Sequence, residues 1–253
     1  MFTFRRHGLT RILFIAFAFS LACAPGSEVR LRRTVPATDA SGFVSIFNGK
    51  DLTGWHTVPK ESAIDWSVRD GVIVGEGHED RLVYLVWRDD DLADFELKLS
   101  YRFRTEGNSG VEIRSRVDGT GKRPFEGYHA DFGHVGIGPA VLGAWDFHFA
   151  RRKEHPCDRG NKLVIDADGN AHYTKIAGAL TAADLNERDW NDVHIIARGT
   201  HCQLRINGKP ASEFVDNFDA YRLERGAIGL QIHDRGMIVE FKDVRLKRLG
   251  PET

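Results

Sequence analysis

Apolar and polar residues alternate with a period of two along several short stretches, and this pattern limits the fold more than any other feature. The clearest stretch is 95–103, Phe-Glu-Leu-Lys-Leu-Ser-Tyr-Arg-Phe. Because successive side chains of a β-strand point to opposite faces, the alternation predicts a strand with one buried and one solvated face. Further predicted strands cover 66–68, 72–74, 193–198, 201–206, 211–215, 227–233 and 237–246.

Turn signals separate these stretches at short intervals. Asn207-Gly208 is a strong hairpin signal, because both turn residues accept a positive φ. Asp70-Gly71 and Asp234-Arg235-Gly236 predict two more strand pairs. Helical signals are few, the best being 181–186 with Thr181 as N-cap. Many short strands without alternating helices predict one all-β domain, a β-sandwich or jelly roll of two antiparallel sheets.

The first residues predict a signal peptide over 1–22. Arg5, Arg6 and Arg11 precede an uncharged stretch, 12–22. As a helix, that stretch would rise only about 16 Å, short of the roughly 30 Å hydrocarbon core of a bilayer. A secretory signal therefore fits better than a transmembrane anchor. We expect an exported protein, either a periplasmic or cell-envelope lipoprotein or a secreted one.

The cleavage site has two interpretations. Leu21-Ala22-Cys23 resembles a bacterial lipobox, which would make Cys23 the lipidation site. Ala22-Cys23-Ala24 also fits an ordinary A-x-A site, although Pro25 would hinder cleavage there. If the lipobox is used, the lipid on Cys23 is the one membrane contact that we expect.

The rest of the chain divides into a flexible linker over 23–41 and the β domain over 42–250. Pro, Gly, Ser and charged residues without periodicity mark the linker. Cys157 and Cys202 either pair or remain as buried free thiols. The net charge of −1 argues against a nucleic-acid partner, since such proteins usually carry a basic excess.

Three stretches place charged or amide side chains two residues apart, opposite apolar residues. If the strands share a sheet, their polar faces form a cluster of acids, imidazoles and amides, which suits a polyhydroxylated ligand. An ordinary solvated face is the alternative for each stretch taken alone. The residues are Glu112, Arg114 and Arg116 in the first stretch, His129 and Asp131 in the second, and Gln231 and His233 in the third.

A divalent metal ion is a candidate cofactor. His129 and Asp131 point the same way, and Glu112 or His233 would supply a third ligand. The metal candidates are therefore His129, Asp131 and His233. The irregular stretch 117–160 adds Asp146, as a loop anchor or a substrate contact, and three histidines that we expect to be bystanders, His134, His148 and His155.

Taken in order, the motifs resemble those of the 3-keto-disaccharide hydrolase domain family. The resemblance covers roughly 43–249 and rests on the order and spacing of its motifs. It implies a concanavalin A-like jelly roll, export, and cleavage of glycosides already oxidised at C3 of the sugar. The motifs are Phe43-Val44-Ser45-Ile46-Phe47-Asn48-Gly49-Lys50-Asp51-Leu52-Thr53-Gly54-Trp55, Asn108-Ser109-Gly110-Val111-Glu112-Ile113-Arg114, Gly127-Tyr128-His129-Ala130-Asp131, Trp190-Asn191-Asp192 and Gly229-Leu230-Gln231-Ile232-His233.

A C3 ketone would allow cleavage by elimination. It acidifies the C2 hydrogen, so that the C1 oxygen can leave and water can add back. The catalytic candidates are Glu112 or Asp131 as base and His129 as acid, and the sequence equally allows the two roles to be exchanged. Arg114 and His233, or a metal ion, would stabilise the oxyanion. The substrate-binding candidates are Arg114, Gln231, His233 and Asp146, and the expected partner is a small-molecule 3-keto-glycoside.

Two other functions fit the same residues. A non-catalytic, lectin-like carbohydrate-binding module would share the fold and the polar face but turn over no substrate. Direct hydrolysis of an unoxidised glycoside would require Glu112 and Asp131 about 5–5.5 Å apart in a retaining enzyme.

Overall fold

A computed structural model describes residues 38–88, 91–134, 136, 138 and 141–250. The predicted signal peptide, Cys23 and the predicted linker up to residue 37 lie outside the described residues. At the end of the predicted linker, Thr38 forms a β-bridge with Val44. The Asp39 carboxylate accepts the backbone N–H groups of Ser41 and Phe43, so these last residues form a hydrogen-bonded turn.

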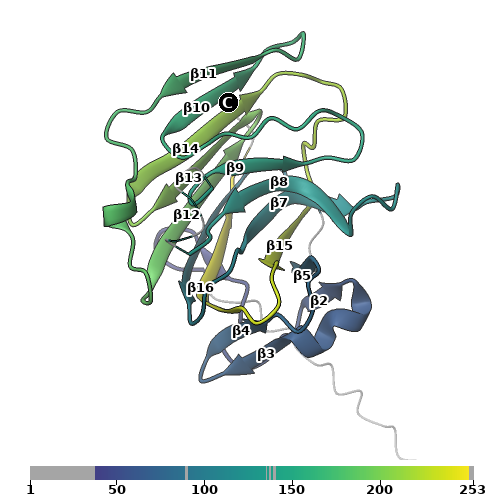
Figure 1. Cartoon of the computed structure of the whole chain (residues 1–253), viewed down its shortest axis with the longest axis vertical. Helices are drawn as coiled ribbons and strands as arrows, with labels where there is room; N and C mark the ends of the chain where they lie inside the picture. The colour runs from purple at the N-terminus through teal and green to yellow at the C-terminus, as the bar shows by residue number, and fades with distance from the viewer. Residues whose placement is uncertain (1–37, 89–90, 135, 137, 139–140, 251–253) are drawn as a thin grey trace, which may run out of the picture. The chain divides into compact units, whose positions relative to one another are not determined.

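Two sheets make up the described part of the chain (Figure 1). The larger has ten strands, in the order β11-β10-β14-β13-β12-β6-β16-β4-β3, with β1 beside β16. Its strands are β1 (Val44–Ser45), β3 (Trp66–Arg69), β4 (Val72–Glu76), β6 (Phe95–Phe103), β10 (Asn161–Ile165), β11 (Ala171–Lys175), β12 (Asn191–Arg198), β13 (His201–Ile206), β14 (Lys209–Asp216) and β16 (Ile238–Arg248).

The smaller sheet has six strands, in the order β2-β5-β15-β7-β8-β9. They are β2 (Trp55–Val58), β5 (Val83–Trp87), β7 (Gly110–Val117), β8 (Phe125–Asp131), β9 (Trp145–His148) and β15 (Ala227–Ile232). The predicted all-β sandwich is confirmed. One pairing departs from the expected antiparallel pattern, because β10 and β14 run parallel.

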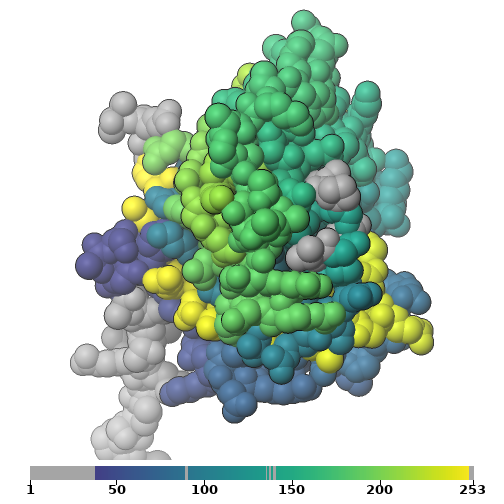
Figure 2. Space-filling model, turned by 60° about the vertical axis from the view of Figure 1, so that its left-hand side comes forward, coloured from purple at the N-terminus to yellow at the C-terminus, as the bar shows by residue number. Residues whose placement is uncertain are grey.

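The chain ends of the domain meet in the larger sheet. Val44 in β1 pairs with Leu246 in β16, so the purple and yellow segments lie together on the face in Figure 2. The first and last strands of the domain are thus hydrogen-bonded neighbours in one sheet.

The core lies between the sheets and follows the predicted alternation. On β6, Phe95, Leu97 and Leu99 are buried in the large apolar cluster. The aromatic ring of Tyr128 on β8 stacks on Phe214 of β14, with ring centroids 4.7 Å apart. The apolar face of β8 therefore points inward, which turns its polar face away from the core.

The turn at 234–236 does not join a hairpin, so that prediction is wrong. β15 pairs with β5 and β7, whereas β16 pairs with β1, β4 and β6. Leu230 of β15 and Phe241 of β16 are both fully buried in the same apolar cluster. The two strands thus face each other across the core, because that buries both apolar faces.

Helices are short. A 3₁₀ helix, η1 (Lys60–Asp65), precedes β3, and η3 (Ala182–Asp184) follows the predicted N-cap Thr181. Thr181 and Asp184 form a reciprocal capping box. Within the described ranges, no helix has the length and apolar character needed to cross a membrane. Cys157 and Cys202 are free, buried thiols.

Candidate functional site

The strand register of the smaller sheet places five titratable side chains in one group. Glu112 on β7 lies opposite His129 on β8, and His129 lies opposite Asp146 on β9. Residues paired in this way point to the same face of an antiparallel sheet. Asp131 and His148 are two residues further along their strands and therefore share that face.

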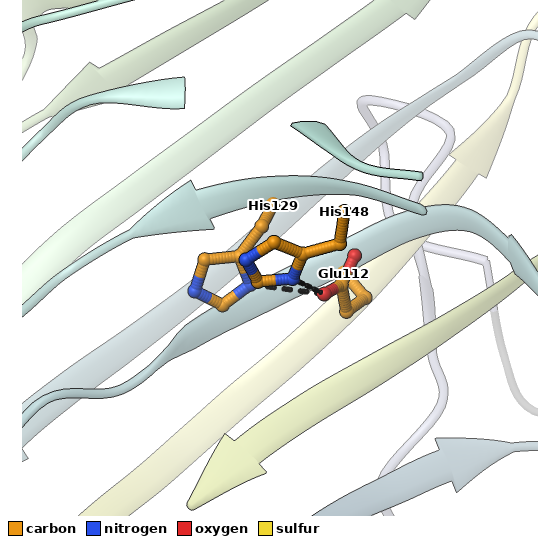
Figure 3. Close-up of side chains that lie close together, drawn as sticks. All are labelled: Glu112, His129 and His148. Atoms are coloured by element: carbon orange, nitrogen blue, oxygen red, sulfur yellow. Dashed lines mark hydrogen bonds and ion pairs between the residues drawn. The ribbon is translucent and has the colours of Figure 1, made fainter. Parts of the chain in front are cut away.

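Glu112 lies at the centre of the group and is fully buried. The Nδ1 atom of His148 makes a short hydrogen bond with its Oε1 atom, and the Nδ1 atom of His129 lies 3.5 Å from the same oxygen (Figure 3). The two imidazole rings stack, with centroids 4.7 Å apart and planes 18° apart. Both histidines thus present Nδ1 to one carboxylate.

The outer nitrogens of the two rings each lie near a second carboxylate. His129 Nε2 is 3.3 Å from Asp131 Oδ1, and His148 Nε2 is 3.5 Å from Asp146 Oδ2. Each imidazole is therefore placed between two carboxylates.

The pKa values follow from this alternation of charge. Burial raises the pKa of Glu112, but the two adjacent histidines outweigh it and lower the pKa below its ordinary value. Burial lowers the pKa of His129 and of His148, yet Asp131 and Glu112, respectively, are the main groups that raise each above the ordinary value. Glu112 and the two imidazoles beside it therefore stabilise each other's charges.

Two glycines make room for the group. A Cβ atom on Gly127 would lie 2.5 Å from Glu112 Oε2, and one on Gly110 would lie 2.5 Å from His129 Nε2. Real Cβ atoms do not approach other atoms this closely, so any side chain at either position would displace the acid or the imidazole.

The group forms part of the wall of a pocket of about 420 Å³, a volume within the range of small-molecule sites. Glu112 does not line the pocket and lies behind the two histidines. The lining residues that carry polar side chains are Asn108, Lys122, Arg123, His129, Asp131, Asp146, His148, Asp158, Gln231 and His233.

An amide and an imidazole from β15 and the turn after it lie at the same pocket. Gln231 is buried, and its Nε2 donates to the Tyr84 hydroxyl at 3.3 Å, while its Oε1 has no hydrogen-bond partner. His233 is half exposed and is hydrogen-bonded through Nδ1 to Asp234 at 2.7 Å. The structure therefore brings Gln231 and His233 to the same pocket as His129 and Asp131.

Arg114 does not join the group, and its predicted role at the pocket is wrong. A β-bulge falls between Ile113 and Arg116, and Arg114 has a φ of 48°. A bulge interrupts the alternation of faces, which the sequence does not reveal. The Arg114 guanidinium donates instead to Gly199 O at 2.6 Å and Asp94 Oδ1 at 3.1 Å.

The set of metal candidates also changes. Among the described residues, the side chains whose ligand atoms lie within 4.8 Å of one another are those of Glu112, His129 and His148. The predicted candidates Asp131 and His233 are outside that set. His148, expected to be a bystander, is inside it. The signal was present in Trp145-Asp146-Phe147-His148, where apolar and polar residues alternate as in a strand.

Residues 42–247 match the model of the 3-keto-alpha-glucoside-1,2-lyase-like domain family. The chain belongs to this family. A 3-keto-disaccharide hydrolase of Bacteroides thetaiotaomicron is 23% identical over 202 residues, which cover 74% of this chain and 61% of that protein. The chain thus spans 61% of the length of this curated relative.

Solved structures of similar fold agree with the architecture. A Parabacteroides distasonis protein named "putative glycosyl hydrolase" has a TM-score of 0.58 and 22% identity, covering 83% of this chain and 95% of its own. A Bacillus subtilis protein of unknown function with a galectin-like fold has a TM-score of 0.50 and 10% identity, covering 79% and 92%. At these identities the likeness shows the fold alone.

Proposed function

We propose that this member of the 3-keto-alpha-glucoside-1,2-lyase-like family is a carbohydrate-active enzyme that cleaves the glycosidic bond of 3-keto-glycosides. The observation that carries the proposal is the pocket, which brings together the carboxylates of Asp131 and Asp146, the imidazoles of His129 and His148, and the amides of Asn108 and Gln231. The Bacteroides relative, named a 3-keto-disaccharide hydrolase, supports the same substrate class.

The reaction follows from the chemistry of a C3 ketone. A base removes the proton from C2, and the electron pair moves onto the C3 oxygen as an enolate. That pair then forms the C1=C2 double bond while the C1–O bond breaks, and the leaving oxygen takes up a proton. Water adds to C1, and C2 regains a proton. The net change is hydrolysis to a 3-keto sugar and an alcohol.

Asp131 is the base in this scheme. Its carboxylate lines the pocket, whereas Glu112 is buried behind the two histidines and cannot reach a bound sugar. Glu112 therefore acts as a positioning residue, holding His129 and His148 through their Nδ1 atoms. The alternative of direct hydrolysis by Glu112 and Asp131 lacks support for the same reason, because one of its two carboxylates would have no access to the anomeric carbon.

The other pocket groups supply the remaining needs of the reaction. His129 and His148 line the pocket and can place positive charge beside the enolate oxygen. Asn108 and Gln231 offer amide donors and acceptors to sugar hydroxyls. His233 on the rim is the group that we assign to protonate the leaving oxygen.

We also keep export as a proposal. The basic, then apolar, first 22 residues are the reason, with Cys23 as the lipidation site if the lipobox is used.

The test is turnover of a 3-keto-glucoside and of its unoxidised parent, followed by NMR in D₂O. We expect cleavage of the keto form alone, with deuterium at C2 of the product beyond the level in an enzyme-free control. D131N should lose about 10²–10⁴-fold in turnover, the usual contribution of a general base. Its matched control is D168N, on the turn between β10 and β11 outside the pocket.

Two results would contradict the proposal. Equal turnover by D131N and the unmodified protein would remove Asp131 as base. Sugar binding without cleavage of either substrate would favour the carbohydrate-binding module instead.

A further inference from the structure

We propose that Glu112, His129 and His148 bind one divalent transition-metal ion of the Zn²⁺ type. The three side chains come from three neighbouring strands, β7, β8 and β9. Each offers a ligand atom, and these atoms all lie within 4.8 Å of one another (Figure 3).

The donor chemistry fits such an ion. Two imidazole nitrogens and one carboxylate oxygen form the ligand set of several catalytic zinc sites, which keep a further position open for water or substrate. The Nδ1 atoms of His129 and His148 both lie beside Glu112 Oε1, so the three donors face a common point.

The surroundings of the two rings fit equally well. A histidine that binds a metal through one nitrogen usually donates its other N–H group to a carboxylate. His129 Nε2 lies 3.3 Å from Asp131, and His148 Nε2 lies 3.5 Å from Asp146. Both rings thus have the outer carboxylate that orients a metal-bound imidazole.

Unpartnered buried atoms give an independent indication of a missing ligand. Glu112 Oε2 and both ring nitrogens of His129 are buried and make no well-directed hydrogen bond. Buried polar atoms nearly always have a partner in folded proteins, and their exceptions call for an explanation such as a bound ion or water. Here three such atoms belong to the same two adjacent side chains.

The site is reachable from the pocket, since His129 and His148 line it. An ion bound there would add positive charge to the pocket wall formed by His129 and His148, which would favour an enolate in the proposed reaction. That role rests on the proposed function, whereas metal binding rests on the side chains alone and is measured without substrate.

The experiment is a calorimetric titration of the EDTA-treated and dialysed full chain with ZnCl₂. We expect one ion per chain. H148A and the nearly isosteric E112Q should each weaken binding by about 100-fold or more, and D146N, which changes an outer carboxylate, by about 10–100-fold. The matched control is H172A, which removes an exposed histidine on β11 that is paired with Asp166, and it should bind like the unmodified protein.

Circular dichroism checks that each variant folds. If H148A does not fold, the affinity of E112Q for Zn²⁺ tests the proposed metal site. Absence of Zn²⁺, Co²⁺ and Mn²⁺ binding at millimolar concentration would overturn the inference. Unchanged affinity in folded E112Q would do the same. Zn²⁺ binding without turnover would remove the proposed function and keep the metal site, whereas turnover by a protein that binds no metal would do the reverse.

Discussion

At the residue scale, the absence of a side chain at Gly127 is as important to the site as the charged groups around it. The Glu112 carboxylate occupies the space where a Cβ atom on Gly127 would lie, at 2.5 Å from Oε2. The Cβ of Ser115 would be only 2.7 Å away. The position therefore has no room even for a methyl group.

We expect G127A to destabilise the protein by about 1–3 kcal/mol, the usual cost of an inserted methyl group in a packed site. It should also lower turnover, because the displaced Glu112 would no longer hold His129 and His148. Urea unfolding and steady-state kinetics measure the two effects. G119A is the control, since nothing lies within 4 Å of a Cβ there. A fully stable and active G127A would show that Glu112 can move freely.

At the element scale, the bulge in β7 separates two side chains of one strand that have different structural roles. The part before the bulge presents Glu112 to the site. Within the bulge, the Arg114 guanidinium, 3% exposed, reaches Gly199 in the turn between β12 and β13 of the other sheet and also pairs with Asp94. Arg114 thus ties the two sheets together.

R114M should therefore lower the free energy of unfolding by about 3 kcal/mol, the lower end of the range for a broken buried ion pair, because Asp94 is partly exposed. The KM for a 3-keto-glucoside should stay unchanged. R114K should recover little stability, since an ammonium group cannot reproduce the planar fork. A raised KM for R114M with an unchanged free energy of unfolding would instead indicate that Arg114 binds the substrate.

At the scale of the whole molecule, turn carboxylates couple the fold to pH. The His172 side chain lowers the pKa of Asp166, and the Lys209 side chain lowers that of Asp184, each to about 2. Hydrogen bonds from Thr53 lower the pKa of Asp51 to about 2 as well. Each of these carboxyl groups has a lower pKa in the folded state than in the unfolded state. Each therefore stabilises the folded state at pH values above the ordinary carboxyl pKa, which is near 4.

That stabilisation should disappear as the pH falls from about 4 to about 2, because protonation then removes the paired charge in the folded protein. Urea midpoints measured from pH 5 to pH 2 should decline over this window. D166N should show a smaller decline than the unmodified protein, and D168N in the same turn should behave like the latter. Identical profiles for D166N and the unmodified protein would remove Asp166 from this effect.

The sequence by itself determined many of the strands and the faces on which several of their side chains lie. Period-two alternation predicted β6 with its observed bounds, and the Asn207-Gly208 signal placed the β13–β14 turn. Glu112, His129 and Asp131 were correctly placed on polar faces for the same reason. Alternation works because it reports a local property, the face to which each side chain points.

Only the tertiary structure decided which faces meet. Nothing local in the sequence shows that β9 pairs with β8, and that pairing brings His148 to Glu112. No local sequence pattern predicts the bulge that redirects Arg114. The same holds for the placement of β15 and β16 in different sheets. Pairing depends on how all the apolar faces are buried together, so it is a property of the whole core and not of any one stretch.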